Sequence, residues 1–263
     1  MRLLLSALAL LTFVGCADRR PAWAKRPAGG TAGDGTIAGE PLTIKRFASA
    51  PVLDGKLDDA IWGTAAIAGP FVAPGDGRAI DKSPVWAFAR LGWDDTKLYV
   101  GVVIEDQAPF APFAREEIDP RIWERSSAVE LMVQPGDPHD NRDYYEIQVD
   151  AEGAVFDTRW DDYNRPISGG PDEASKKFGH HEWSSKVERA IHKDKGFYSV
   201  ELAIPWAAFD HARTAVPPKA GDVWRLNLYS FRDGQRQALA WSPIRGEGNF
   251  HRASRFGRIK LEG

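Results

Sequence analysis

The chain has 263 residues, of which 43% are hydrophobic and 27% are charged, so a wholly disordered or collagen-like protein is excluded. Its formal net charge of −3 lacks the basic excess typical of nucleic-acid-binding proteins, and no nucleic-acid partner is expected. The chain has 10 Trp and 1 Cys. The single Cys excludes an intramolecular disulfide, while Trp rings either fill a core or stack on a ligand.

The first 15 residues are typical of a secretory signal. Arg2 is followed by an apolar run over residues 3–14, which is shorter than the roughly 20 residues a membrane-spanning helix needs. The run ends at Cys16, and this arrangement resembles a bacterial lipoprotein signal, in which the Cys thiol receives a lipid. We therefore expect residues 1–15 to be a lipoprotein-type signal peptide. An ordinary signal peptide followed by an incidental Cys is the alternative.

Residues 16–40 have a different composition. Pro, Gly and Ala are interleaved there, and no apolar residue recurs with the period of a helix or a strand. Such a composition predicts a flexible Gly/Pro/Ala-rich linker. A lipid on Cys16 would then tether a soluble domain at the bacterial cell envelope without inserting it. Secretion without an anchor is the other expectation.

From residue 41 onward, short alternating runs are separated by turn residues. Between 197 and 204, for example, Tyr198, Val200 and Leu202 share one face while Ser199 and Glu201 share the other, which is the period of a strand. Strands are predicted over residues 42–47, 86–93, 98–105, 128–134, 144–150, 155–160, 183–192, 197–204, 222–232, 238–241 and 258–261. Two short helices are predicted, over 59–64 and 206–209. We therefore predict one all-β domain over 41–263, a two-sheet antiparallel β-sandwich of immunoglobulin-like or jelly-roll-like type.

Five stretches, in order, resemble motifs of the family 9 carbohydrate-binding module and its wider, DOMON-related relatives. They are Pro51–Trp62, Leu98–Asp106, Trp123–Glu130, Val200–Trp206, and Trp241–Pro243 with Phe250–Gly257. The likeness covers nearly all of the predicted domain. It implies a non-catalytic sandwich that binds a poly- or oligosaccharide, with xylan- or cellulose-type sugars as candidates, and that supports carbohydrate catabolism beside a glycoside hydrolase.

The resemblance also implies a set of binding residues. Trp123 and Phe250 would hold a sugar between two rings, although the family has Trp where this chain has Phe250. The polar partners would be Glu130, Gln148, Asp150 and Tyr229, with His251 as a further donor. Gln148 and His251 stand where the family has Arg. Arg232, Arg245 and Asn249 are near these positions in the sequence or on adjoining strands.

Three other functions remain open. A glycoside hydrolase would need two carboxylates on either side of a cleft, which sequence alone does not show. A haem-binding module would draw on Met132, the only Met of the mature chain. A structural envelope protein would have lost its ligand.

The segment Asp157–Asn164 combines aromatic rings with carboxylates and could form a further sugar platform, a calcium loop or a solvated loop. Calcium-binding relatives make a structural calcium ion possible, with no ligands assigned, and no cofactor is otherwise implied. His180-His181-Glu182 lacks the second His of a zinc-binding HExxH motif, so no zinc site is expected.

Overall fold

The computed structural model describes residues 18–80, 83–246 and 249–263. The predicted signal peptide and Cys16 lie outside this range. Within it, no helix is long and apolar enough to cross a membrane.

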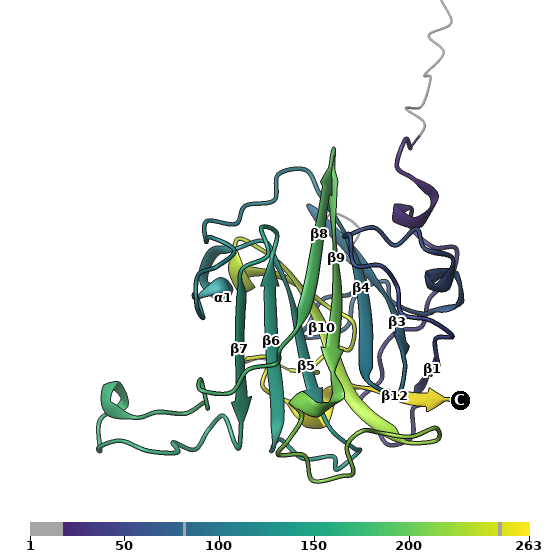
Figure 1. Cartoon of the computed structure of the whole chain (residues 1–263). Helices are drawn as coiled ribbons and strands as arrows, with labels where there is room; N and C mark the ends of the chain where they lie inside the picture. Colours follow the sequence, from purple (N-terminus) through teal and green to yellow (C-terminus); the bar gives the residue numbers. More distant parts are fainter. Residues whose placement is uncertain (1–17, 81–82, 247–248) are drawn as a thin grey trace, which may run out of the picture.

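Two β-sheets form a sandwich (Figure 1). The larger sheet has the strand order β1 (Leu42–Lys45), β12 (Gly257–Glu262), β10 (Val223–Arg232), β5 (Ala128–Gln134), β6 (Tyr144–Asp150) and β7 (Val155–Trp160), with β11 (Gln237–Ala240) also paired to β10. The smaller sheet has the order β2 (Ala66–Ala68), β3 (Val85–Trp93), β4 (Lys97–Asp106), β9 (Phe197–Pro205) and β8 (Glu188–Asp194). The pairing of β1 with β12 is parallel and the other strand pairs are antiparallel. The predicted all-β sandwich is confirmed.

In the part of the chain that the structure describes, helical structure is confined to single turns. The one α-helical turn is α1 (Ile122–Arg125), and the 3-10 turns are η1 (Ala22–Ala24), η2 (Ala60–Thr64), η3 (Glu173–Ser175), η4 (Trp206–Ala208), η5 (Gly234–Arg236) and η6 (Ala253–Arg255). The helices predicted over 59–64 and 206–209 are found as η2 and η4. The α1 turn was not predicted.

One predicted strand begins later than expected. The strand predicted from residue 183 starts only at Glu188, as β8. Lys186 has a φ of 52°, which interrupts an extended backbone, and the backbone N–H and hydroxyl of Ser185 both bond to the Asp157 carboxylate instead of a neighbouring strand. The short strand β2 was not predicted.

Three apolar clusters cover both faces of both sheets. The largest lies between the sheets and includes Leu131 and Ile147 from the larger sheet and Val100 from the smaller one. The second contains side chains that point to the other side of the same strands, such as Met132 and Tyr229. It therefore lies on the outer face of the larger sheet. A third covers the outer face of the smaller sheet. Because each face is covered, β5 and β6 are buried along their whole length, and any site on the larger sheet must lie within its outer covering.

The segment predicted as a flexible linker packs along the domain. The Thr31 carbonyl accepts hydrogen bonds from the Trp241 indole at 2.7 Å and from Gly69 N–H at 3.0 Å. The Gly35 carbonyl accepts one from the buried Arg225. A Cβ on Gly33 would lie 2.6 Å from Ser242, so only glycine fits this approach. The described residues before 41 therefore pack against the strands and loops of the predicted domain. The composition favoured a linker because small residues are common in flexible chain. The same small residues also permit close packing against a domain.

Candidate functional site

A cavity of about 350 Å³ opens on the outer face of the larger sheet, beside α1. Figure 1 shows α1 next to one end of β7 and β6. The cavity is lined by Arg121, Trp123, Glu146, Phe156, Trp160, Tyr163, His181, Gln235, Asn249 and His251. These residues come from α1, from β6 and β7, and from loops that are distant in the sequence, so the cavity forms only when the sandwich is complete.

Aromatic side chains form most of the cavity wall. The Trp123 ring packs edge-on against Phe156, with 4.7 Å between ring centroids. On the other side, Trp160 lies 5.1 Å from Tyr163, and the Tyr163 ring stacks on His251 at 3.8 Å. A set of flat apolar faces around one small space is suited to a ligand that has both apolar C–H surfaces and polar groups.

A buried polar network lies next to these rings. Glu146 lines the cavity, and its two oxygens accept hydrogen bonds from the Trp160 indole at 2.8 Å and from the Gln148 amide at 2.6 Å. The same Gln148 nitrogen lies 3.4 Å from a carboxylate oxygen of Glu130, to which the cavity-lining Gln235 also donates at 3.3 Å. Strand pairing sets this arrangement, because Glu130 lies opposite Gln148 in the β5–β6 register.

Part of the network has no protein partner. Glu130 and Gln148 have no exposed surface, and one side-chain oxygen on each, Oε1, has no hydrogen-bond partner. Buried polar atoms are normally paired, and orphaned ones call for a ligand, a water or a proton. The network therefore offers unused acceptors close to the cavity.

Burial changes the ionisation of these groups. It raises the pKa of Glu146 to about 7 and, together with the charge of Glu146, raises the pKa of Glu130 well above its usual range. Burial also lowers the pKa of His251 to about 3, so this imidazole is neutral at physiological pH. Its Nδ1 lies 2.8 Å from the Tyr144 hydroxyl.

The structure brings together only part of the predicted site. Trp123 and His251 line the cavity. Gln148 and Glu130 do not line it, but each bonds to a residue that does. Gln148 bonds to Glu146, and Glu130 bonds to Gln235.

Phe250, the ring expected to face Trp123, is packed elsewhere on the outer face. Phe250 is 7% exposed, and its ring stacks on Tyr229 with centroids 4.1 Å apart and planes 4° from parallel. Phe250 is not among the residues that line the cavity. Phe250 and Tyr229 are therefore placed as packing residues of the outer cluster, because an apolar ring on that face is covered by its neighbours.

Other predicted residues also have structural partners. The Asp150 carboxylate accepts N–H bonds from Glu152 and Ala154, and so closes the turn between β6 and β7. Arg232 lies 3.5 Å from Asp106, and Arg245 donates to the Asp76 carbonyl. Asn249, by contrast, does line the cavity.

The sequence prediction missed several of the lining residues. Glu146 could have been found, because strand alternation places it on the same face as Gln148, two residues away. Trp160 and Tyr163 belong to the Asp157–Asn164 segment, for which a sugar platform was one interpretation, and they do reach the cavity. Arg121, Phe156 and Gln235 had no distinguishing signal in the sequence, and His181 was considered only as part of a zinc motif.

The structure does not form a calcium loop from the acidic residues of this segment. The Asp157 carboxylate is held by Ser185, and Asp161 is held by Arg159 and His180. Across the described ranges, no group of three or more His, Cys, Asp and Glu residues is arranged to hold a metal ion. Met132 is fully buried in the outer cluster and does not line the cavity, so it does not fit the role of a haem ligand there.

Comparisons with known proteins agree with the fold. The model of the family described as carbohydrate family 9 binding domain-like matches residues 53–263. A family 9 carbohydrate-binding module from Caldicellulosiruptor kristjanssonii, solved with cellotriose, is 19% identical, with 84% of this chain and 94% of that chain covered and a TM-score of 0.55. The same organism's module solved with glucose is 18% identical, with 84% and 96% covered and a TM-score of 0.53.

A protein from Bacteroides uniformis that is proposed to bind carbohydrate is 17% identical, with 86% of this chain and 100% of that chain covered and a TM-score of 0.63. These structural similarities support a shared fold. No curated protein sequence matches the chain.

Proposed function

Because the chain belongs to the carbohydrate family 9 binding domain-like family, we propose that it binds carbohydrate without catalysis, in the cavity beside α1. The observation that carries this proposal is the combination of aromatic walls and a buried carboxyl group in one small space. The proposed ligand is the end of a poly- or oligosaccharide, and xylan- and cellulose-derived oligosaccharides are the first to test.

The two kinds of group in the cavity match the two kinds of surface on a sugar ring. Trp123, Trp160 and Tyr163 place aromatic rings at the cavity wall, against which the C–H surfaces of a pyranose can pack. The Glu146 carboxylate accepts hydrogen bonds from hydroxyls, and Gln235 and Asn249 can both donate and accept. Affinity is expected to be on the order of micromolar to millimolar, because one small sugar buries little surface.

The geometry favours binding over hydrolysis. A glycoside hydrolase needs two carboxyl groups that flank the scissile bond. Here Glu146 and Glu130 bond to the same Gln148 amide on one face of one sheet, and only Glu146 lines the cavity. Carboxyl groups on one side of the cavity do not flank a glycosidic bond from both sides.

The proposed place of action is the bacterial cell envelope, with a glycoside hydrolase as a partner that acts on the same polysaccharide. The support for an anchor is the sequence around Cys16. Mass spectrometry of the mature N-terminus is expected to show Cys16 as the first residue with a diacylglycerol mass, and a Cys16→Ser protein is expected to lack that mass. A mature chain that begins elsewhere would contradict the anchor.

Replacing Trp123 with Ala is expected to weaken sugar binding by about 2 kcal/mol, roughly thirtyfold, because the variant loses one aromatic wall of the cavity. Titration calorimetry with cello- and xylo-oligosaccharides measures this change. Trp86→Ala is the matched control, since Trp86 lies on β3 in the smaller sheet and does not line the cavity. Equal affinity in the wild type and the Trp123 variant would refute the site.

A further inference from the structure

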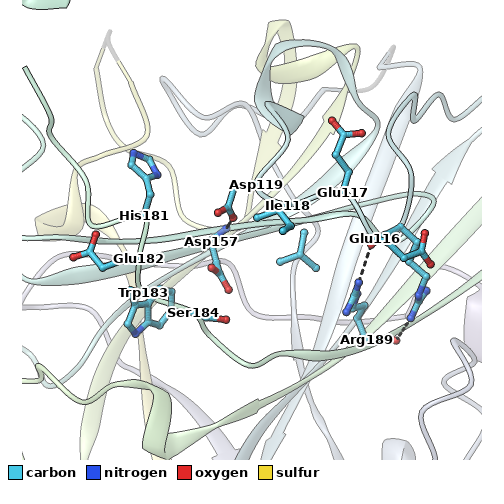
Figure 2. Close-up of a pocket in the computed structure, with 12 residues that line it drawn as sticks. Glu116, Glu117, Ile118, Asp119, Asp157, His181, Glu182, Trp183, Ser184 and Arg189 are labelled. Carbon is cyan, nitrogen blue, oxygen red and sulfur yellow. Dashed lines mark hydrogen bonds between the residues drawn. The ribbon is translucent and has the colours of Figure 1, made fainter. Parts of the chain in front are cut away.

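A second, open groove of about 380 Å³ adjoins the cavity, and His181 lines both. Figure 2 shows the groove with His181 and Glu182 at one end, Asp119 and Asp157 in the middle, and Glu116 and Arg189 at the other end. A ligand longer than one sugar unit that extends past His181 would therefore enter this groove.

The groove is strongly acidic. Its carboxyl-bearing lining residues are Glu116, Glu117, Asp119, Asp157 and Glu182. Its two cationic residues, Arg115 and Arg189, each donate to a backbone carbonyl of the other, and Arg189 also donates to the Gly153 carbonyl. Burial raises the pKa of Asp157, and the negative charge of Asp119 adds a smaller contribution in the same direction.

The cavity also carries carboxyl groups, at its wall and directly behind it. Glu146 lies on its wall and Glu130 is joined to it through Gln148, while Glu130 Oε1 is buried without a partner. Of the described side chains that line the cavity, Arg121 is the one permanently charged cation, and it is exposed and bonds to Glu124. The other titratable groups around Glu146 are His181, His251, Tyr144, Tyr163 and Tyr229. None of these carries a permanent positive charge.

Aromatic rings arranged around a carboxylate favour a cation over a neutral hydroxyl. The face of a Trp or Tyr ring attracts an ammonium group, and a buried carboxylate bonds more strongly to an ammonium than to a hydroxyl. We propose that the sugar held in the cavity carries a protonated amino group, as a β-1,4-linked glucosamine unit does, and that further amino-bearing units lie along the acidic groove. This inference rests on the proposed sugar-binding function, which it narrows to an amino sugar.

The direct test compares two trimers on the same skeleton. Cellotriose and the β-1,4 trimer of glucosamine differ at C2, where one has a hydroxyl and the other an ammonium. At about pH 6, where that amine is protonated, calorimetry is expected to show the amino trimer binding about tenfold more tightly, which corresponds to about 1.4 kcal/mol. In Glu146→Gln this ratio is expected to fall close to one. Glu188→Gln, an exposed carboxylate on β8, is the matched control and should keep the ratio.

Proton release provides an independent readout. The pKa of Glu146 is about 7 in the free protein, so its carboxyl is largely protonated at about pH 6. A bound ammonium favours the ionised carboxylate and so lowers that pKa, and the proton passes to the buffer. The measured enthalpy should therefore depend on the ionisation enthalpy of the buffer for the amino trimer, and not for cellotriose. This difference should disappear in Glu146→Gln.

The groove is tested with exposed residues, whose replacement is expected to leave the fold intact. The hexamer of glucosamine is expected to bind about threefold more tightly than the trimer at low salt, and this gain is expected to shrink at high salt, where exposed charges are screened. The double variant Glu116→Gln/Glu117→Gln should lose the gain.

The outcomes separate the two proposals. Equal affinity for the two trimers, or tighter binding of cellotriose, overturns the amino-sugar inference and leaves carbohydrate binding in place. Failure of the wild type to bind either trimer or any neutral oligosaccharide overturns both. A hexamer that gains nothing over the trimer overturns the role of the groove.

Discussion

Replacing Arg225 with Met is expected to lower the free energy of unfolding by about 4 kcal/mol, because the change leaves several buried groups without a partner. Arg225 has no exposed surface and lies on β10. Its guanidinium donates to the Asp137 carboxylate at 2.7 Å and to the carbonyls of Gly35, Ser254 and Phe256 at 3.1 to 3.3 Å. One side chain thus joins the N-terminal segment, the loop after β5 and the C-terminal segment that follows His251.

Urea unfolding measures this loss. The control is Arg46→Met, which removes an exposed ion pair with Asp95 and should cost less than about 1 kcal/mol. Arg225→Lys should recover little of the stability, because an ammonium cannot reproduce the planar set of donors. An Arg225→Met protein within about 1 kcal/mol of the wild type would show that water replaces the guanidinium.

Replacing Glu201 with Ala is expected to destabilise the protein by about 3 kcal/mol, since three N–H groups lose their acceptor. The Glu201 carboxylate on β9 accepts bonds from Asp54 N–H at 2.9 Å, from Gly55 N–H at 2.7 Å and from the Trp62 indole at 2.8 Å. Gly55 has a φ of 88°, and a Cβ there would lie 2.4 Å from His192 N, so this turn depends on glycine. Glu201 thereby fixes the loop that covers the outer face of the smaller sheet.

The matched variant is Glu188→Ala on the neighbouring strand β8. Its carboxylate is exposed and pairs with Lys97, so a small effect is expected. Because the loop held by Glu201 is far from the sugar cavity in the fold, the Glu201 variant should keep its sugar affinity below its unfolding transition. A change in affinity as large as that in Trp123→Ala would contradict this separation.

Alternation in the sequence predicted most of the strands, because apolar side chains that face the core between the sheets alternate with more polar ones on the outer face. The bounds of β5, β6 and β7 match the predicted ranges. The start of β8 was not predictable from period alone, since the bonds of Ser185 to Asp157 join residues 28 positions apart.

The site was predictable only in part, for a related reason. A local motif identified Trp123, and alternation indicates that Gln148 and Glu146 share a face. Nothing local shows that Phe250 stacks on Tyr229, or that Trp160 and Tyr163 reach the same space as Trp123, because loops from distant parts of the chain cover the outer face of the sheet. On a covered face of this kind, the sequence does not distinguish a ring that packs in the apolar cluster from a ring that lines a binding cavity.

With the proposed lipid on Cys16, the packing of residues 18–40 along the domain would limit how far the protein reaches from the membrane. Free chain of that length would let the domain range about 25 Å from its point of attachment. Arg20 and Arg26 instead both pair with Glu105 at the end of β4. These ion pairs hold the N-terminal segment against the domain from Arg20 onward. With the proposed lipid on Cys16, the sandwich would rest against the bilayer in a narrow range of orientations, and it would capture glycans that approach the membrane surface.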